Sequence, residues 1–209
     1  MRPPIFCYLT GVLVFAREVF VCKCSTDVMR LDPNAGELAK QLEFIEGTKA
    51  DLDRLPVEHH SDDAKAELEQ RLDRGEYWML GQIDGRIATY TWLHKRDIAT
   101  YPSLPGCDIT LSDDTGYGYD AWTPPELRGK GLRRSAFLEE LWVLKNRLEC
   151  NWEASFFVKH QLEGATKSLG SVGIEIIPTW RVWYNKQRTL EAELILEDDV
   201  ARPAFLPPK

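Results

Sequence analysis

The chain has 209 residues, of which 44% are hydrophobic and 11% aromatic, so it can bury one sizeable core. Its 26 Lys and Arg against 33 Asp and Glu give a net charge of -7, with a pI near 5.2. Because nucleic acids are bound through a basic face, this balance argues against nucleic acid as a partner. One globular domain is expected.

The five cysteines are odd in number and scattered, unlike the disulfide framework of a small secreted protein. Reduced thiols and a cytoplasmic location are therefore expected. The pair in Cys22-Lys23-Cys24 lacks a second Cys or His pair at zinc spacing, so no metal site is predicted. The cysteines are Cys7, Cys22, Cys24, Cys107 and Cys150.

The run Ile5 to Ala16 is apolar over the length of a signal peptide but is too short to span a bilayer. Arg17 and Glu18 interrupt it, and no small-residue cleavage pattern follows. A first strand or an N-terminal extension is favoured, with a targeting segment as the alternative. The expected organisation is residues 1–18 as this extension or first strand, residues 19–197 as the main domain and residues 198–209 as an irregular tail.

The residue pattern from Val12 to Asp73 predicts strands followed by two helices. The β-branched and aromatic residues from Val12 to Val28 favour one or two strands. Asp32-Pro33-Asn34 is a helix-start signal, so a helix is expected over Ala35 to Glu46. Ser61-Asp62-Asp63 is a capping cluster before a second helix over Ala64 to Asp73.

A β-hairpin is predicted next, because Tyr77 to Ile83 and Arg86 to Leu93 flank the turn signal Asp84-Gly85. A third strand over Gly116 to Trp122 follows a polar stretch. The remaining expected elements are a helix over Ser135 to Leu148, a strand over Trp152 to Val158, a helix over Gln161 to Leu169, and strands over Ile174 to Tyr184 and Thr189 to Leu196.

The loop between the third strand and the next helix has the features of a phosphate-binding site. Gly129 and Gly131 let the backbone approach a ligand closely, and the following helix directs free N–H groups toward it. Four basic side chains lie within seven residues, from Arg128 to Arg134. This combination predicts an anionic ligand.

The loop resembles the pyrophosphate loop of the GNAT superfamily of N-acyltransferases, Arg/Gln-x-x-Gly-x-Gly/Ala. Arg128, Gly131 and Arg133 take the Arg, first Gly and Gly/Ala places, so Arg133 departs from the pattern. The order of the expected elements is also similar to that family, over roughly Val19 to Ile195. The resemblance implies a mixed α/β fold in which helices flank a mixed central sheet.

The resemblance also implies an activity, transfer of an acyl group from acyl-CoA directly to a primary amine, with acetyl-CoA as the default cosubstrate and no metal. It places the cofactor on two stretches. One is the strand end, where a backbone N–H is expected to bond the thioester carbonyl, and the other is the loop with its backbone amides. The cofactor-binding residues expected are Ala121, Trp122, Arg128, Gly129, Lys130, Gly131, Leu132 and Arg133.

The proton-transfer groups are less clearly indicated. Asp120 is the leading candidate base, because a carboxylate on a hydrophobic strand must reach solvent, pair with a cation such as Arg128, or work in a cleft. His94 is a further candidate. The family's usual acid, a Tyr on a later helix, has no counterpart here, which leaves Tyr184, Ser168 acting through water, or unaided departure of the thiolate.

The expected partner is a small-molecule or peptide amine, and a homodimer is compatible with this interpretation. No membrane span is predicted. The alternative is a GNAT-like module that binds CoA or another phosphorylated ligand without catalysis. A nucleotide-dependent phosphotransferase is disfavoured because no Gly-x-x-x-x-Gly-Lys-Ser/Thr sequence occurs.

Overall fold

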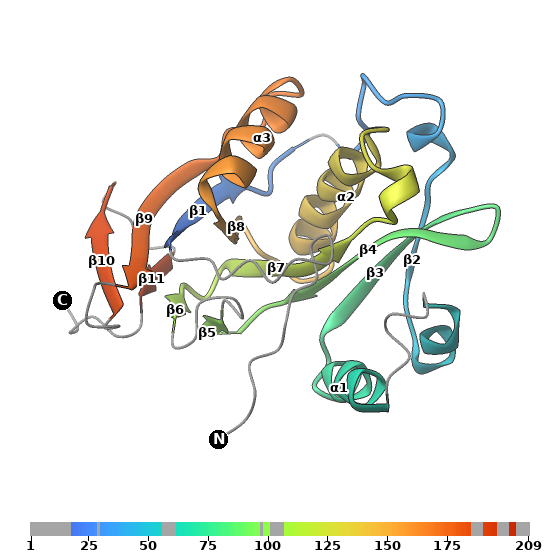
Figure 1. Cartoon of the computed structure of the whole chain (residues 1–209), viewed down its shortest axis with the longest axis horizontal. Coiled ribbons are helices and arrows are strands. Elements are labelled where there is room, and N and C mark those ends of the chain that lie inside the picture. The colour runs from blue at the N-terminus through green and yellow to red at the C-terminus, as the bar shows by residue number, and fades with distance from the viewer. Residues whose placement is uncertain are drawn as a thin grey trace. The chain divides into compact units, whose positions relative to one another are not determined.

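The computed structural model describes residues 18–28, 30–55, 62–96, 98–100, 107–184, 190–195 and 201–203 (Figure 1). These residues form two compact units. The first unit comprises the described residues within Met1–Thr26, Lys95–Tyr117 and Glu149–Lys209. The second unit comprises those within Asp27–His94 and Gly118–Leu148.

Eight strands are hydrogen-bonded in the order β10-β9-β1-β8-β7-β4-β3-β2, and three more in the order β11-β6-β5. Helices pack on the strands of each unit, and the predicted mixed α/β fold class is confirmed. The strands are β1 Glu18–Ser25, β2 Glu43–Glu46, β3 Tyr77–Ile83, β4 Arg86–His94, β5 Ile98–Thr100, β6 Asp108–Leu111, β7 Thr115–Trp122, β8 Trp152–Phe157, β9 Ile177–Tyr184, β10 Leu190–Leu194 and β11 Ala201–Pro203. The α-helices are α1 Asp62–Asp73, α2 Leu132–Asn146 and α3 Lys159–Gly170. Short 3-10 helices cover Ala39–Gln41, Lys49–Arg54 and Pro125–Leu127.

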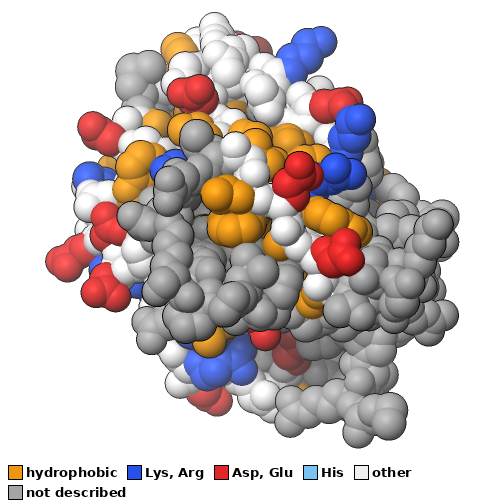
Figure 2. All heavy atoms as spheres, turned by 90° about the vertical axis from the view of Figure 1, so that its left-hand side faces the viewer, with side chains coloured by type: hydrophobic (Ala, Val, Ile, Leu, Met, Phe, Trp, Pro, Cys, Tyr) orange, Lys and Arg blue, Asp and Glu red, His pale blue; other side chains and the backbone are white. Residues whose placement is uncertain are grey.

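In the first unit, β1 lies between β8 and β9 and is antiparallel to both. Helix α3 packs against β1 and β8 (Figure 1). The buried positions of these strands range in size from Ala154 to Trp180, and Val21, Ala154 and Val182 are fully buried. On the side of this unit that carries β10, exposed acidic and hydrophobic side chains are interspersed (Figure 2).

In the second unit, the predicted hairpin is confirmed. Strands β3 and β4 pair antiparallel from Tyr77↔Leu93 to Ile83↔Arg86. Asp84 and Gly85 both have positive φ, 50° and 71°, which is the backbone that a two-residue turn of this hand requires. Strand β2 pairs with β3 on one side of the hairpin, and helix α2 packs against β4.

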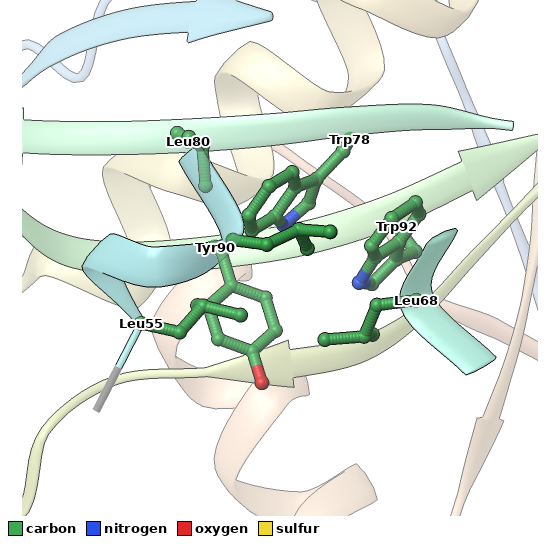
Figure 3. Packing of buried hydrophobic residues seen from close by; sticks show 7 residues of the cluster. Leu55, Leu68, Trp78, Leu80, Tyr90 and Trp92 are labelled. Carbon is green, nitrogen blue, oxygen red and sulfur yellow. The ribbon is translucent and has the colours of Figure 1, made fainter. Parts of the chain in front are cut away.

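An aromatic core lies under α1 in the second unit (Figure 3). The rings of Trp78 and Trp92 stack nearly parallel, with centroids 5.2 Å apart and an interplanar angle of 4°. Leu68 from α1 and Leu55 from the preceding segment pack on these rings. Because both indoles are fully buried, they contribute much of this unit's hydrophobic stabilisation.

The predictions for α1, α2, α3 and β8 are confirmed, with ends shifted by only a few residues. The helix expected over Ala35 to Glu46 is wrong, since this segment contains only a 3-10 turn followed by strand β2. Phe44 and Ile45 are good strand residues, and β2 extends the sheet by pairing with β3. Tertiary pairing therefore outweighs the local helix-start signal.

The tail expected to be irregular contains the short strand β11, which pairs with β6. Strands β5 and β6 lie in the polar stretch where no strand was predicted. Among the described residues, Cys22, Cys24, Cys107 and Cys150 are buried and form no disulfide, and Cys7 lies outside those residues. Within the part of the chain that the structure describes, no helix is long and apolar enough to cross a membrane.

Candidate functional site

Strand β7 contains one residue with left-handed backbone, Asp120, in its second half. Asp120 has φ 51°, a left-handed conformation that costs free energy for any residue except glycine. The parallel pairing of β7 with β8 runs from Thr115↔Trp152 to Tyr117↔Ala154 and so ends before this residue. The backbone beyond Tyr117 is therefore arranged by contacts within the second unit.

Two threonines of β4 hold that part of the strand. The Thr89 hydroxyl donates to the carbonyl of Trp122 at 2.8 Å, and the Thr91 hydroxyl donates to the carbonyl of Tyr119 at 3.3 Å. The Trp122 ring stacks on Tyr90, with centroids 5.6 Å apart. Side-chain donors and ring packing thus fix the carbonyls on both sides of Asp120, while Ala121 between them is exposed.

The Asp120 carboxylate pairs with Arg71 of α1, whose Nη1 lies 2.6 Å from Oδ2. Arg71 also donates to Glu67 at 2.8 Å and lies over the rings of Tyr119 and Trp92. Burial alone lowers the pKa of Arg71, but Asp120, Tyr119 and Glu67 outweigh burial and raise it above its ordinary value. The pairing of Asp120 with Arg128 considered from the sequence is wrong, because Arg71 takes that place.

A second polar contact lies beside this pair. The Tyr119 hydroxyl donates to the buried carboxylate of Glu76, which is also 2.9 Å from Arg74. The imidazole of His94 meets the Tyr119 ring edge-on, with centroids 5.6 Å apart. Burial, reinforced by Arg74, lowers the pKa of His94 to about 4, so the imidazole is neutral near pH 7.

The sequence did not indicate Arg71 or Glu76 as part of the site. Arg71 lies 49 residues before Asp120, and Glu76 lies 43 residues before Tyr119. The one local signal was the helical i,i+4 spacing of Glu67 and Arg71, which is common on solvated helix surfaces. Only the packing of α1 on the sheet brings these charges to β7.

The glycine loop has the backbone that the phosphate-binding interpretation needs. Gly129 and Gly131 have φ 74° and 81°, and a Cβ atom on either would meet nothing within 4 Å. Gly131 is the N-cap of α2 and provides no side-chain cap. The first N–H groups of an α-helix have no acceptor within the helix, so those of α2 are available to an anion at this open surface.

The basic side chains around the loop fall into two groups. Arg133 lies 2.9 Å from the buried carboxylate of Glu140, and Arg134 lies 2.7 Å from that of Asp32. Arg128 uses Nε to donate to the carbonyl of Thr123 at 3.0 Å, and both Arg128 and Lys130 are exposed. Arg133 and Arg134 are therefore held by internal carboxylates, whereas the ends of Arg128 and Lys130 face solvent.

The other predicted residues take different positions. Leu132 is buried at the start of α2, where it anchors the helix rather than presenting a side chain to a ligand. Tyr184 ends β9 in the first unit, and its side chain lies outside the described residues. Among the described side chains, no group of three or more His, Cys, Asp and Glu is placed to hold a metal ion.

No protein-family model matches the sequence, and no curated protein matches it. Solved structures do match. One is a GCN5-related glucosamine N-acetyltransferase region of a fungal multi-domain GH3 β-N-acetylglucosaminidase, with a TM-score of 0.54 at 14% identity. Another is an acetyltransferase of the GNAT family from Colwellia psychrerythraea, with a TM-score of 0.50 at 9% identity.

The chain has the GNAT fold. The matches cover 78% and 76% of it, and they confirm at the level of the fold the resemblance predicted from the loop and the element order. The chain spans 20% of the fungal protein and 52% of the Colwellia protein. In this GNAT fold, the left-handed residue Asp120 and the N-terminus of α2 both lie in the second unit.

Proposed function

We propose that the protein is an acyl-CoA-dependent N-acyltransferase that moves an acyl group, acetyl by default, from CoA directly to a primary amine. One observation carries the proposal. In a chain with the GNAT fold, the uncapped start of α2 follows two left-handed glycines with open space beside them. The four buried thiols among the described residues support a reducing, cytoplasmic setting.

The loop is proposed to bind the diphosphate of CoA. The backbone amides of Gly129, Lys130, Gly131, Leu132 and Arg133 supply donors, whereas that of Arg128 already donates to the carbonyl of Pro125 at 3.3 Å. The positive end of the α2 dipole also favours an anion. Lys130 and the exposed end of Arg128 supply charge. Arg133 contributes its amide only, because Glu140 already holds its guanidinium.

The end of β7 is proposed to meet the thioester end of the cosubstrate. Ala121 is exposed there, directly after the left-handed residue, and Trp122 is fixed through its carbonyl and its ring. A backbone amide aimed at the developing oxyanion lowers the barrier by about 3 kcal/mol in comparable sites. A rigid strand end suits this role, because the donor needs no reorganisation during the reaction.

Asp120 is proposed to receive the proton that the attacking ammonium group must lose. Its Oδ2 is held by Arg71, and its side chain is 33% exposed, so an acceptor amine can reach the carboxylate from solvent. Arg71 is itself held by a second ion pair to Glu67, and a fixed Arg71 in turn orients the Asp120 carboxylate. Tyr184 as the acid for the departing thiolate stays a prediction.

The amine acceptor is proposed to be a small molecule or a peptide. The fungal neighbour is described as a glucosamine N-acetyltransferase region, which makes an amino sugar the first acceptor class to test. An exposed carboxylate next to the proposed reaction centre also suits a cationic acceptor, since the amine arrives as an ammonium ion.

The test combines binding with turnover. Calorimetry measures the affinity of the protein for CoA. Release of free thiol from acetyl-CoA in the presence of amino sugars, polyamines or peptides measures turnover. Binding together with acceptor-dependent thiol release supports the proposal. Binding without turnover on any acceptor supports the non-catalytic module instead, and no binding at saturating CoA refutes the proposed function and leaves only a module for another phosphorylated ligand.

A further inference from the structure

The segment from Arg30 to Gly36 forms a tight turn organised by Asp32. The Asp32 Oδ1 accepts the backbone N–H of Asn34 at 2.8 Å, and its carbonyl accepts the N–H of Ala35 at 3.1 Å. An aspartate side chain that accepts from the backbone two residues later is a common way to fix a turn. Asp32 therefore sets the local shape of this segment.

The same side chain ties the turn to the start of α2. Its second oxygen, Oδ2, lies 2.7 Å from Nε of Arg134, and the Asp32 side chain is only 1% exposed. Arg134 also donates through Nη2 to the carbonyl of Asn34 at 2.9 Å. One guanidinium in the first turn of α2 thus binds both the side chain and the backbone of the turn.

The tied segment reaches the glycine loop itself. A Cβ atom on Gly36 would lie 3.9 Å from the carbonyl oxygen of Lys130, which is ordinary van der Waals distance. Lys130 lies between the two left-handed glycines. The segment therefore passes close to the loop backbone at Lys130, between the two glycines proposed to bind the ligand.

We propose that Asp32 is a positioning residue for the phosphate loop, acting through Arg134 to hold the loop amides in their ligand-binding arrangement. The inference rests on the proposed function. Preformed donors bind an anion better than mobile ones because no conformational entropy is lost on binding. Arg134 is then a structural cation, and Asp32 matters to CoA affinity although it is not itself among the proposed ligand-binding residues.

The chain offers a matched control in a second ion pair from the same segment. Arg30 pairs with Glu139 of α2 through Nε and Nη2, both at 2.6 Å, and lies over the Trp142 ring at 4.0 Å. Glu139 lies five residues beyond Arg134 along α2. Breaking this pair weakens the attachment of the segment to α2 without removing the contact to the first turn.

The experiment compares Asp32→Asn, Asp32→Asn with Arg134→Met, and Arg30→Gln by calorimetry with CoA. Asparagine keeps the acceptor for the Asn34 amide but weakens the bond to Arg134. We expect about tenfold weaker CoA binding in both Asp32 variants, and affinity within twofold of the parent protein for Arg30→Gln. The KM for acetyl-CoA should rise in the Asp32 variants while kcat stays nearly constant.

A pure charge effect predicts the opposite. If Asp32 served only to neutralise Arg134, then Asp32→Asn would free a cation and tighten CoA binding, and the double variant would return to the parent affinity. Either result overturns the inference, as does equal weakening by Arg30→Gln. Hydrogen exchange of the Ser135 amide, which donates to the Gly131 carbonyl at 3.2 Å, tests the positioning without CoA, and unchanged protection in Asp32→Asn also overturns it. If the parent protein bound no CoA but this amide lost protection in Asp32→Asn, only the proposed function would fail.

Discussion

Gly131 offers the sharpest test of the loop, through the substitution Gly131→Asp. The residue has φ 81°, and nothing within 4 Å would meet a new Cβ. The substitution therefore adds a left-handed side chain at a cost of about 1 kcal/mol, and it creates no clash. Because aspartate tolerates this conformation better than most residues, the protein should still fold.

Gly131→Asp should weaken CoA binding through charge repulsion and through steric intrusion. A carboxylate about 4 Å from a phosphate is repelled by roughly 1 kcal/mol in bulk water and roughly 4 kcal/mol in a partly buried site. Since the loop is largely exposed, a value near the lower limit applies, and a further contribution comes from steric intrusion at the closest approach. A loss of 1.4 kcal/mol corresponds to tenfold, so CoA affinity should fall by at least about tenfold.

Gly75 provides the matched control for calorimetry. It follows α1, has φ 75°, and also has no atom within 4 Å of a new Cβ. Gly75→Asp therefore introduces the same charge and the same left-handed backbone strain outside the loop, and it should leave CoA binding unchanged. An affinity within twofold of the parent protein for Gly131→Asp, or an equal loss for Gly75→Asp, would refute the assignment of the loop.

Three further predictions concern other residues. Asp120→Asn should lower kcat about 100-fold with an unchanged Kd for CoA. Glu67→Gln removes only the other partner of Arg71, so it should lower kcat far less. Equal effects of the two substitutions on kcat in steady-state kinetics would show that Asp120 is not the base. The pKa of His94 is near 6.5 in the unfolded chain and about 4 in the folded protein, so the unfolded chain binds the proton first as pH drops. The free energy of unfolding should therefore fall by up to about 3 kcal/mol between pH 7 and pH 4. Urea titrations of His94→Gln should lack this part of the loss, and a pH dependence unchanged by the substitution contradicts the burial of a neutral imidazole. Burial raises the pKa of Cys22 and of Cys107 to about 12, so both thiols should resist a thiol reagent at pH 8 until denaturant is added. Mass spectrometry locates the labelled residues. Rapid labelling of either cysteine in the native protein would count against its burial.

The elements predicted well from the sequence are those whose signals are local. Asp84-Gly85 specifies its own hairpin because both residues accept positive φ, and the flanking strands are rich in β-branched and aromatic residues. The glycine loop is also a local signal, because Gly129 and Gly131 readily adopt the positive φ values found there. These features needed no knowledge of tertiary contacts.

What the sequence could not predict depends on partners far along the chain. Strand β2 exists because β3 offers it a pairing edge, and Asp32 and Asn34, interpreted as a helix start, instead bind Arg134 about 100 residues away. Asp120 was identified as a candidate, but its partner Arg71 comes from a helix whose packing the sequence did not specify. Long-range ion pairs carry no signal in residue spacing.

The stacked indoles of Trp78 and Trp92 have a practical consequence. Two indole rings that face each other at 5.2 Å couple their electronic transitions, which alters the circular dichroism and fluorescence of the protein. Because both rings lie in the second unit, such an optical signal would report on the unit that contains the glycine loop. A titration that changes this spectrum would therefore detect a rearrangement of that aromatic core without any added label.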